Sequence, residues 1–169
     1  VGVVGIRSRG KNHIENFIRI KDSRVISICD ADENLFARTI AEIEKLGGEK
    51  PGTYVDFRKM LDDKNIDAVS IATPGYWHAL MAVNACQAGK DVYVEKPISY
   101  NVDEGRKMVL AARKYDRIVQ AGTQRRSNRL SLKAIQLLKE GVIGDVYMGR
   151  GTVYRTRQDI GKKPDTTVP

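Results

Sequence analysis

The chain has few residues of the kinds that build disulfide, metal or hydrolase sites. Its 169 residues include two cysteines, two histidines and one tryptophan. Cys29 and Cys86 both lie in apolar segments, so we expect reduced core residues and a reducing compartment rather than a disulfide framework. With His13 and His78 as the only histidines, we expect no metal site. A Gly-x-Ser-x-Gly nucleophile elbow is also missing, which argues against a serine hydrolase.

Long hydrophobic runs are missing too. No apolar run approaches the ~18 residues that a membrane span requires, and the amino end lacks a basic-then-apolar signal pattern. We therefore expect a cytoplasmic protein with no membrane partner. The chain begins at Val1, inside a strand-like run and without an initiator Met, which leaves open an upstream segment such as a removed export signal.

The net charge of +8 is unevenly distributed. Residues 1–104 contain 14 Lys/Arg and 16 Asp/Glu, a net charge of −2, whereas residues 105–169 contain 15 and 5, a net charge of +10. The basic residues near the carboxyl end include Arg125, Arg126, Arg129, Arg150, Arg155, Arg157, Lys162 and Lys163. This pattern is typical of a solvated, partner-facing or anion-attracting surface. Because no RNA- or DNA-binding motif accompanies it, we expect no nucleic-acid partner.

Short, β-rich apolar runs alternate with longer segments of helical period. This alternation predicts an α/β fold in which helices cover a parallel sheet. We expect five strands, at residues 2–5, 25–30, 68–72, 91–94 and 118–121. We expect six helices, at residues 12–20, 33–46, 57–61, 77–88, 102–115 and 130–140.

The pattern changes after Gly144. Apolar and polar residues alternate over 145–154, which predicts a further extended segment, and residues 160–169 are typical of a loop. We therefore divide the chain into an α/β domain over residues 1–122, a connecting helical region over 123–143, and the beginning of a second domain over 144–169, whose remainder is absent.

A glycine-containing turn follows the first expected strand. The segment Gly5-Ile6-Arg7-Ser8-Arg9-Gly10 is close to the dinucleotide fingerprint, in which glycines permit a tight turn, close approach to a pyrophosphate and close helix packing. The match is imperfect, because Arg7 replaces the middle glycine. The Cβ of Arg7 should displace the phosphates outward, although its guanidinium can pair with them. A turn kept only for packing is the alternative interpretation.

An acidic residue ends the second expected strand. Asp30 stands twenty positions after Gly10, where a carboxylate accepts hydrogen bonds from the adenosine ribose and repels a 2′-phosphate. Asp32 can be this acid instead, and either residue can simply cap the next helix. Since no basic residue follows until Arg38, the sequence favours NAD over NADP.

Two more segments follow strands that end at the same predicted sheet edge. In Glu95-Lys96-Pro97, the lysine can orient a hydroxyl or a cofactor amide and take part in proton transfer, although a lone lysine is more often solvated. The segment from Thr73 to His78 follows the central strand. Taken alone, it favours an ordinary loop with a solvent-facing His78.

These segments together resemble the amino-terminal domain of the glucose-fructose oxidoreductase, inositol dehydrogenase and MocA (Gfo/Idh/MocA) family. The resemblance covers nearly the whole chain. It rests on Gly5–Gly10 with His13, Ile28-Cys29-Asp30, Ala72-Thr73-Pro74 with Trp77-His78, Tyr93–Pro97, Gly122-Thr123-Gln124 and Gly144-Asp145-Val146. It implies a Rossmann, doubly wound parallel sheet over residues 1–122 that holds NAD or NADP. A substrate domain that often forms an oligomer interface follows in that family, so we expect a homo-oligomer when the protein is intact.

The resemblance also implies roles by position. The residues expected around the cofactor, from pyrophosphate to nicotinamide, are Gly5, Arg7, Ser8, Arg9, Gly10, Asp30, Thr73, Pro74, Trp77, His78, Glu95, Lys96, Pro97 and Gln124. Lys96 is the one catalytic residue that we expect, because family members usually take their proton-transfer Asp and His from the second domain.

Three functions follow from these residues and from the resemblance. The first is an NAD-dependent oxidoreductase that acts on a sugar, polyol or related hydroxyl compound, with this segment alone binding cofactor but catalytically incomplete. The second is an NAD-dependent glycosidase, since some relatives oxidise a sugar hydroxyl transiently, eliminate the glycosidic substituent and return the hydride. The third is a non-enzymatic nucleotide-binding module.

Overall fold

A computed structural model of the chain describes residues 1–156 and Gly161. The chain divides into two compact units, one that ends at Gly122 and one that begins at Thr123, and each is described by itself. Apart from Gly161, the expected loop at 160–169 lies outside the described residues, as do Arg157, Lys162 and Lys163.

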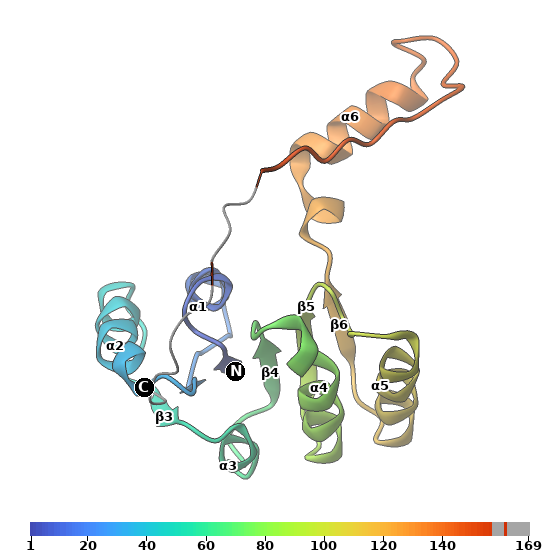
Figure 1. The fold of residues 1–169 in the computed structure, drawn as a ribbon. Helices are drawn as coiled ribbons and strands as arrows, with labels where there is room; N and C mark the ends of the chain where they lie inside the picture. Colours follow the sequence, from blue (N-terminus) through green and yellow to red (C-terminus); the bar gives the residue numbers. More distant parts are fainter. Residues whose placement is uncertain (157–160, 162–169) are drawn as a thin grey trace. The chain divides into compact units, whose positions relative to one another are not determined.

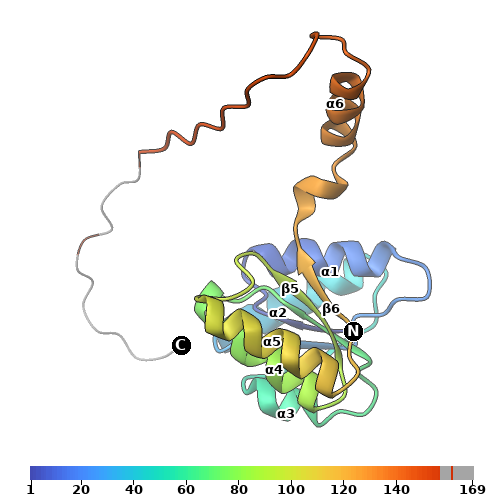
Figure 2. The ribbon, with the colours of Figure 1, turned by 90° about the vertical axis from the view of Figure 1, so that its right-hand side faces the viewer.

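The first unit is a parallel sheet of six strands with helices on both faces (Figures 1 and 2). The strand order is β3-β2-β1-β4-β5-β6, and all five strand pairs are parallel. Its elements are β1 (Gly2–Val4), α1 (Arg9–Arg19), β2 (Ser27–Cys29), η1 (Glu33–Leu35), α2 (Phe36–Lys45), β3 (Gly52–Tyr54), α3 (Phe57–Leu61), β4 (Ala68–Ile71), η2 (Gly75–Trp77), α4 (His78–Gln87), β5 (Asp91–Glu95), α5 (Val102–Lys114) and β6 (Val119–Gly122). The predicted Rossmann, doubly wound sheet is confirmed.

The strand order reverses between β1 and β4. The chain runs outward from β1 to β3, returns to β4 on the other side of β1, and continues outward to β6. In sheets of this kind, loops diverge at the reversal and leave a crevice at the carboxyl ends of the strands, where dinucleotides bind. The topology therefore directs attention to the loops that follow β1 and β4.

Alternation along the strands divides the core into two layers. Val3 and Ile28 face α1 and α2, where they pack with Ile14 and Ile43. The next residues, such as Val4, face the opposite side, which α3, α4 and α5 cover (Figure 2). Successive strand residues point to opposite faces of a sheet, so each short strand supplies both layers of the core.

Three differences between the observed and the predicted elements lie in the amino-terminal half of the first unit. The edge strand Gly52–Tyr54 is not among the five predicted strands; it has three residues, two of them exposed, and so no apolar run marked it. Helix α1 begins at Arg9 rather than residue 12, which brings Gly10 into its first turn. The segment predicted as one helix over 33–46 consists of η1 followed directly by α2, and the Asp32 side chain caps η1 by accepting a hydrogen bond from the backbone N–H of Asn34.

The second unit contains η3 (Gln124–Ser127) and α6 (Arg129–Lys139). The Asn128 side chain caps α6 by accepting a hydrogen bond from the backbone N–H of Ser131 at 3.1 Å. The extended segment predicted over 145–154 forms no strand: residues 145–156 have no regular secondary structure. A β-strand requires a neighbouring strand for its hydrogen bonds, and no described strand pairs with this segment.

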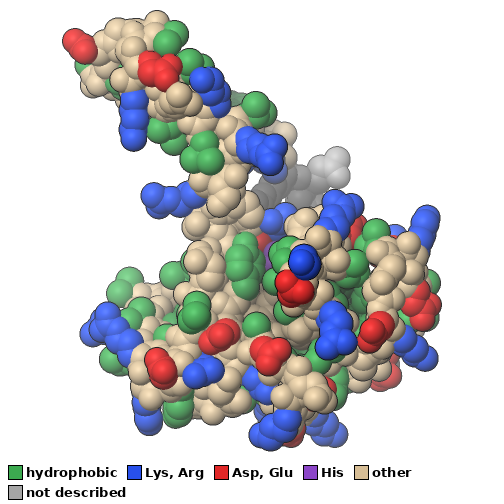
Figure 3. Space-filling view, turned by 180° about the vertical axis from the view of Figure 1, so that it is seen from behind, with side chains coloured by type: hydrophobic (Ala, Val, Ile, Leu, Met, Phe, Trp, Pro, Cys, Tyr) green, Lys and Arg blue, Asp and Glu red, His purple; other side chains and the backbone are tan. Residues whose placement is uncertain are grey.

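The surface of the first unit mixes charges of both signs. On the face in Figure 3, lysine, arginine, aspartate and glutamate side chains are interspersed over this unit. This agrees with the near balance of charge over residues 1–104. Among the described residues, no helix is both long enough and apolar enough to cross a membrane.

Candidate cofactor-binding and active site

Two glycines make the turn after β1 possible. Gly5 has φ +79°, and a Cβ placed there would lie 2.8 Å from backbone atoms of Ala72 and Thr73. At Gly10, a Cβ would lie 1.9 Å from the carbonyl oxygen of Gly5. These are the first and third glycines of the dinucleotide fingerprint, and here both are required by close approach of backbone to backbone.

The turn leads directly into the amino end of α1. Ser8 is the N-cap residue, and its side chain makes no capping hydrogen bond. The backbone N–H groups of the first helical turn therefore remain available for an anion, and the helix dipole favours negative charge at this end. Arg9, the first residue of α1, adds a guanidinium. The turn fits the pyrophosphate of a dinucleotide.

Asp30 and Asp32 have different roles after β2. The Asp30 carboxylate accepts hydrogen bonds from the backbone N–H of Ile6 at 2.9 Å and from that of Asp32 at 3.1 Å. It therefore connects the end of β2 to the glycine turn. Asp32 caps η1 and forms an ion pair with Arg7, the residue at the middle glycine position. The capping role that the sequence left open for either acid belongs to Asp32.

The loop after β4 is joined to the loop after β5 through His78. This side chain is only 1% exposed, so the solvent-facing interpretation is wrong. Its Nδ1 lies 2.6 Å from the carbonyl oxygen of Pro97, and its Nε2 lies 2.8 Å from that of Thr73. Gly75 also packs against the Pro97 ring, which a Cβ at Gly75 would approach to 3.0 Å. His78 thus connects the two loops from a buried position, with both ring nitrogens within hydrogen-bond distance of backbone carbonyl oxygens.

The Glu95-Lys96-Pro97 segment separates a buried acid from an exposed base. Glu95 ends β5 and is 4% exposed, whereas Lys96 is exposed at the carboxyl edge of the sheet. The peptide bond between Lys96 and Pro97 is cis. The lysine ammonium can reach a ligand at this edge, and the Glu95 carboxylate points into the protein.

A buried polar cluster lies between α1 and the strands β4 and β5. Glu95 Oε1 accepts from Arg9 Nε at 2.8 Å and lies 3.0 Å from Nε2 of His13, whose Nδ1 lies 2.8 Å from Ser70 Oγ. The His13 ring also stacks edge-on against Tyr93, with centroids 5.3 Å apart. Ser70 and the His13 side chain are not among the residues for which the sequence predicts a role. A signal was present: Ser70 is a polar residue inside the apolar strand β4.

Burial and hydrogen bonding set the protonation of this cluster. Burial lowers the pKa of His13 below its usual 6.5 and outweighs the opposing effect of Glu95. Burial alone would raise the pKa of Glu95, but the hydrogen bonds from Arg9 and His13, together with the positive charge of Arg9, outweigh burial and lower this pKa. A neutral His13 and an ionised Glu95 are therefore favoured at neutral pH.

We expect the free energy of unfolding to fall as the pH is lowered below about 6.5, because the unfolded chain then gains a proton that folded His13 resists. A second fall should follow below about 4.5, where unfolded Glu95 is protonated before folded Glu95. Denaturant unfolding followed by fluorescence of Trp77, the single tryptophan, measures both. In His13→Gln, the first fall should be smaller; an unchanged slope between pH 7 and 5 would contradict this assignment.

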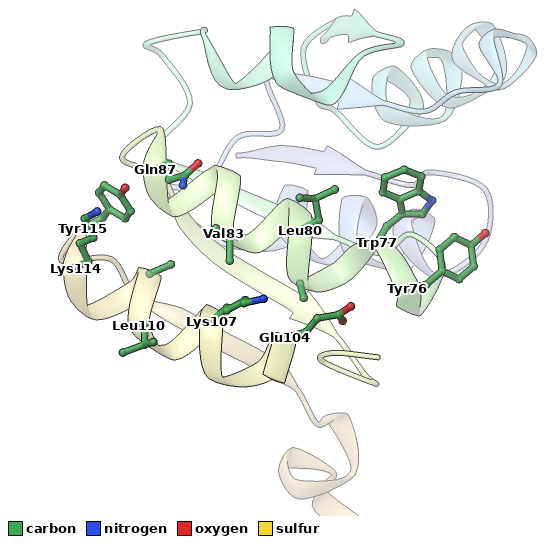
Figure 4. Close-up of a pocket in the computed structure, with 12 residues that line it drawn as sticks. Tyr76, Trp77, Leu80, Val83, Gln87, Glu104, Lys107, Leu110, Lys114 and Tyr115 are labelled. Atoms are coloured by element: carbon green, nitrogen blue, oxygen red, sulfur yellow. The ribbon is translucent and has the colours of Figure 1, made fainter. Parts of the chain in front are cut away.

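Two of the residues predicted to bind the cofactor, Trp77 and Gln124, are not brought together with the glycine turn. Trp77 lines a groove of about 650 Å³ between α4 and α5, together with helix residues such as Leu80 and Leu110 (Figure 4). Side chains of the two helices form most of this groove, so it is distinct from the turn after β1. Gln124 belongs to the second unit. Within the described residues, no group of three His, Cys, Asp or Glu side chains is arranged to hold a metal ion.

Comparison with known proteins agrees with this geometry. Residues 1–123 match the family model of the Gfo/Idh/MocA oxidoreductases with an NAD-binding Rossmann fold. A curated relative, Glycosyl hydrolase family 109 protein 1 of Shewanella sp. (strain ANA-3), is 29% identical over 153 residues, which are 88% of this chain and 33% of the relative.

Solved structures of inositol dehydrogenases are also similar. Myo-inositol 2-dehydrogenase from Lactobacillus plantarum is 28% identical with a TM-score of 0.76, covering 86% of this chain and 42% of that one. Scyllo-inositol dehydrogenase from Lactobacillus casei, solved with NAD(H) and scyllo-inositol, is 27% identical with a TM-score of 0.74, covering 85% and 42%. The chain thus spans about a third to two fifths of the length of these proteins. It belongs to the Gfo/Idh/MocA family of NAD-binding oxidoreductases.

Proposed function

We propose that the full-length polypeptide carrying this chain is an NAD-dependent oxidoreductase that acts on a sugar, polyol or related hydroxyl compound. One observation carries the proposal: the glycine turn, Asp30 and Lys96 follow β1, β2 and β5 at one edge of the sheet. Doubly wound sheets bind dinucleotides at this edge. The inositol dehydrogenases among the similar structures support a substrate with several hydroxyl groups.

The residues at this edge fit NAD. The close backbone approach at Gly5 and Gly10 creates space that any Cβ would fill, and the first turn of α1 offers N–H groups to the pyrophosphate. The Asp30 carboxylate would accept hydrogen bonds from the ribose hydroxyls. The second role of Asp30, as acceptor for two backbone N–H groups, leaves lone pairs of its carboxylate for this purpose. NAD, when bound, supplies the hydride acceptor.

Lys96 is the residue of this chain that we assign to the chemistry. Its ammonium would donate a hydrogen bond to the reacting hydroxyl, polarise it and stabilise the developing oxyanion as the proton leaves. We expect the group that accepts the proton to come from a second domain, as the family resemblance implies. Glu95, buried behind the lysine, is not positioned to take this proton because its Oε1 faces Arg9 and His13.

The preference for NAD over NADP rests on the charge at the end of β2. The Asp30 carboxylate is held there by two backbone N–H groups, and it would repel a 2′-phosphate. Arg7 is a basic residue that could bind that phosphate, but its guanidinium pairs with Asp32. Binding of NADP through Arg7 would require this ion pair to break, whereas binding of NAD would not.

The name of the curated relatives favours a second candidate function. They are called glycosyl hydrolases of family 109, and the same edge of the sheet would serve a glycosidase that oxidises a sugar hydroxyl only transiently. In that reaction, Lys96 would polarise the same hydroxyl. The overall result would be cleavage of a glycosidic bond with no net change in the cofactor.

An assay of the full-length polypeptide separates these functions. We expect inositols, other polyols or sugars to drive stoichiometric formation of reduced nicotinamide, followed by its absorbance, with a higher kcat/KM for NAD than for NADP. Glycoside cleavage without accumulated reduced cofactor would instead favour the glycosidase. Tight NAD binding with neither reaction would favour the non-enzymatic module and overturn the proposal.

A further inference from the structure

Three buried polar side chains, those of Glu95, His13 and Ser70, form a cluster next to Lys96. Glu95 and His13 are each 4% exposed, and Ser70 is fully buried. The three side chains come from β5, α1 and β4, three elements that are far apart in the sequence. Val3 pairs with Ser70, and Ser70 pairs with Tyr93, which places Ser70, Tyr93 and Glu95 on the sheet face that α1 covers.

The hydrogen-bond directions in this cluster follow from the chemistry of its members. A carboxylate only accepts hydrogen bonds, so His13 donates its Nε2–H to Glu95 Oε1. In a neutral ring, Nδ1 then carries the lone pair, and the Ser70 hydroxyl donates to it. Glu95 therefore fixes the tautomer of His13, because a carboxylate accepts only, and Ser70 holds the other side of the ring. His13 in turn helps to hold the Glu95 carboxylate.

Glu95 connects this cluster both to Arg9, beside the glycine turn, and to Lys96. Its Oε1 also accepts from Arg9 Nε at 2.8 Å, and its Oε2 accepts from the backbone N–H of Lys96 at 3.2 Å. The Arg9 side chain remains 41% exposed and has further N–H groups with which to meet a pyrophosphate. One carboxylate thus orients an anion-binding group of α1 and the backbone of the lysine.

We propose that Glu95 is a positioning residue supported by His13 and Ser70, which couples the phosphate-binding turn to Lys96 and does not itself touch the cofactor. The inference rests on the proposed function and assigns to Glu95 a role behind the lysine. Replacement of the carboxylate by the amide of glutamine would leave Arg9, His13 and the Lys96 N–H with one neutral acceptor oxygen in place of two charged ones, and would leave the Arg9 charge unbalanced. The lysine would then be held less precisely, and small displacements of a catalytic group have large kinetic effects.

The first test concerns the cluster in the absence of cofactor. Nitrogen NMR of the full-length polypeptide should show His13 as the Nε2–H tautomer and a slowly exchanging Arg9 Nε–H. Both signals should change in Glu95→Gln. The matched control is Glu42→Gln, which removes a carboxylate that pairs with another basic residue of α1, Lys11 at 2.8 Å, away from Lys96. Unchanged His13 and Arg9 signals in Glu95→Gln would overturn the inference whether or not the enzyme turns over.

The second test measures the coupling to binding and turnover, per folded molecule as judged by Trp77 fluorescence. We expect Glu95→Gln to lower kcat by roughly 10- to 100-fold and substrate KM to change little. The losses of NAD affinity in Arg9→Ala and Glu95→Gln should not add in the double variant, because both break one interaction. In His13→Leu, kcat should fall by about as much as in Glu95→Gln. In His13→Gln, which keeps a hydrogen-bond donor toward Glu95, kcat should stay close to that of the wild type.

The outcomes of the second test separate the two proposals. If no variant, including the wild type, turns over but the losses of NAD affinity are coupled, the positioning role stands and the proposed oxidoreductase function fails. If the wild type turns over while Glu95→Gln matches Glu42→Gln in kcat and the affinity losses add, Glu95 is only structural. Additive losses without turnover would reject both proposals.

Discussion

Replacement of Lys96 by alanine is expected to lower kcat of the full-length polypeptide by roughly 10²- to 10⁴-fold, with NAD affinity within about threefold of the wild type. We expect this difference because different groups carry out the chemistry and the binding of the cofactor. The lysine side chain is exposed at the carboxyl edge of the sheet, whereas Glu95 accepts a hydrogen bond from its backbone N–H. In the proposed function, the dinucleotide is held instead by the turn after β1. Steady-state kinetics and calorimetric titration with NAD measure the two effects separately.

Two variants control this experiment. Lys21→Ala removes another exposed lysine, from the turn after α1, and should leave kcat unchanged. Lys96→Arg keeps a positive charge and hydrogen-bond donors but cannot lose a proton at working pH. Partial activity in Lys96→Arg would assign the lysine to polarising the hydroxyl, and complete loss would assign it to proton transfer as well. Unchanged turnover in Lys96→Ala, with near-normal NAD affinity, would remove Lys96 from the chemistry.

Replacement of Gly10 by alanine is expected to destabilise the first unit by about 3 kcal/mol, because its Cβ would lie 1.9 Å from the carbonyl oxygen of Gly5. No side chain can rotate to relieve this overlap, since the obstacle is backbone. The turn must therefore shift, and the helix amino end moves relative to β1. NAD affinity should fall at least about 10-fold in the fraction that remains folded. Denaturant unfolding monitored at Trp77 reports the stability of this unit.

The matched control for this variant is Gly52→Ala on the edge strand β3. There the nearest atoms to an added Cβ are 3.5 Å away, which is ordinary contact, and the residue is exposed. We expect a change in stability within about 0.5 kcal/mol and normal NAD binding. Equal stabilities for Gly10→Ala and Gly52→Ala would show that the glycine turn is looser than its geometry indicates.

Much of the fold was predictable because it depends on local patterns. Apolar runs marked five of the six strands, and the helical period marked the helices between them. The exceptions have local reasons. Strand β3 is short and mostly exposed, so its pairing with β2 rather than its composition makes it a strand. The start of α1 at Arg9 depends on close packing of Gly10 against Gly5, which periodicity does not reveal.

The site was predictable only in part. Gly5, Asp30 and Lys96 directly follow β1, β2 and β5, and parallel strands bring such positions to one edge whatever the details of packing. The orientation of His78 was not predictable. A histidine in a turn-forming segment is typical of a solvated loop, but here contacts with Thr73 and Pro97, which belong to two different loops, bury it.

The sequence by itself determined five of the six strands with the helices between them, the glycine turn, the acid after β2 and the lysine after β5, because each is a pattern of neighbouring residues. Only the tertiary structure decided that Ser70, His13 and Glu95 meet. Their contacts join residues 57 and 82 positions apart, across two strands and a helix. Buried polar groups take whichever partner the packing brings within reach, and a linear pattern does not contain that distance.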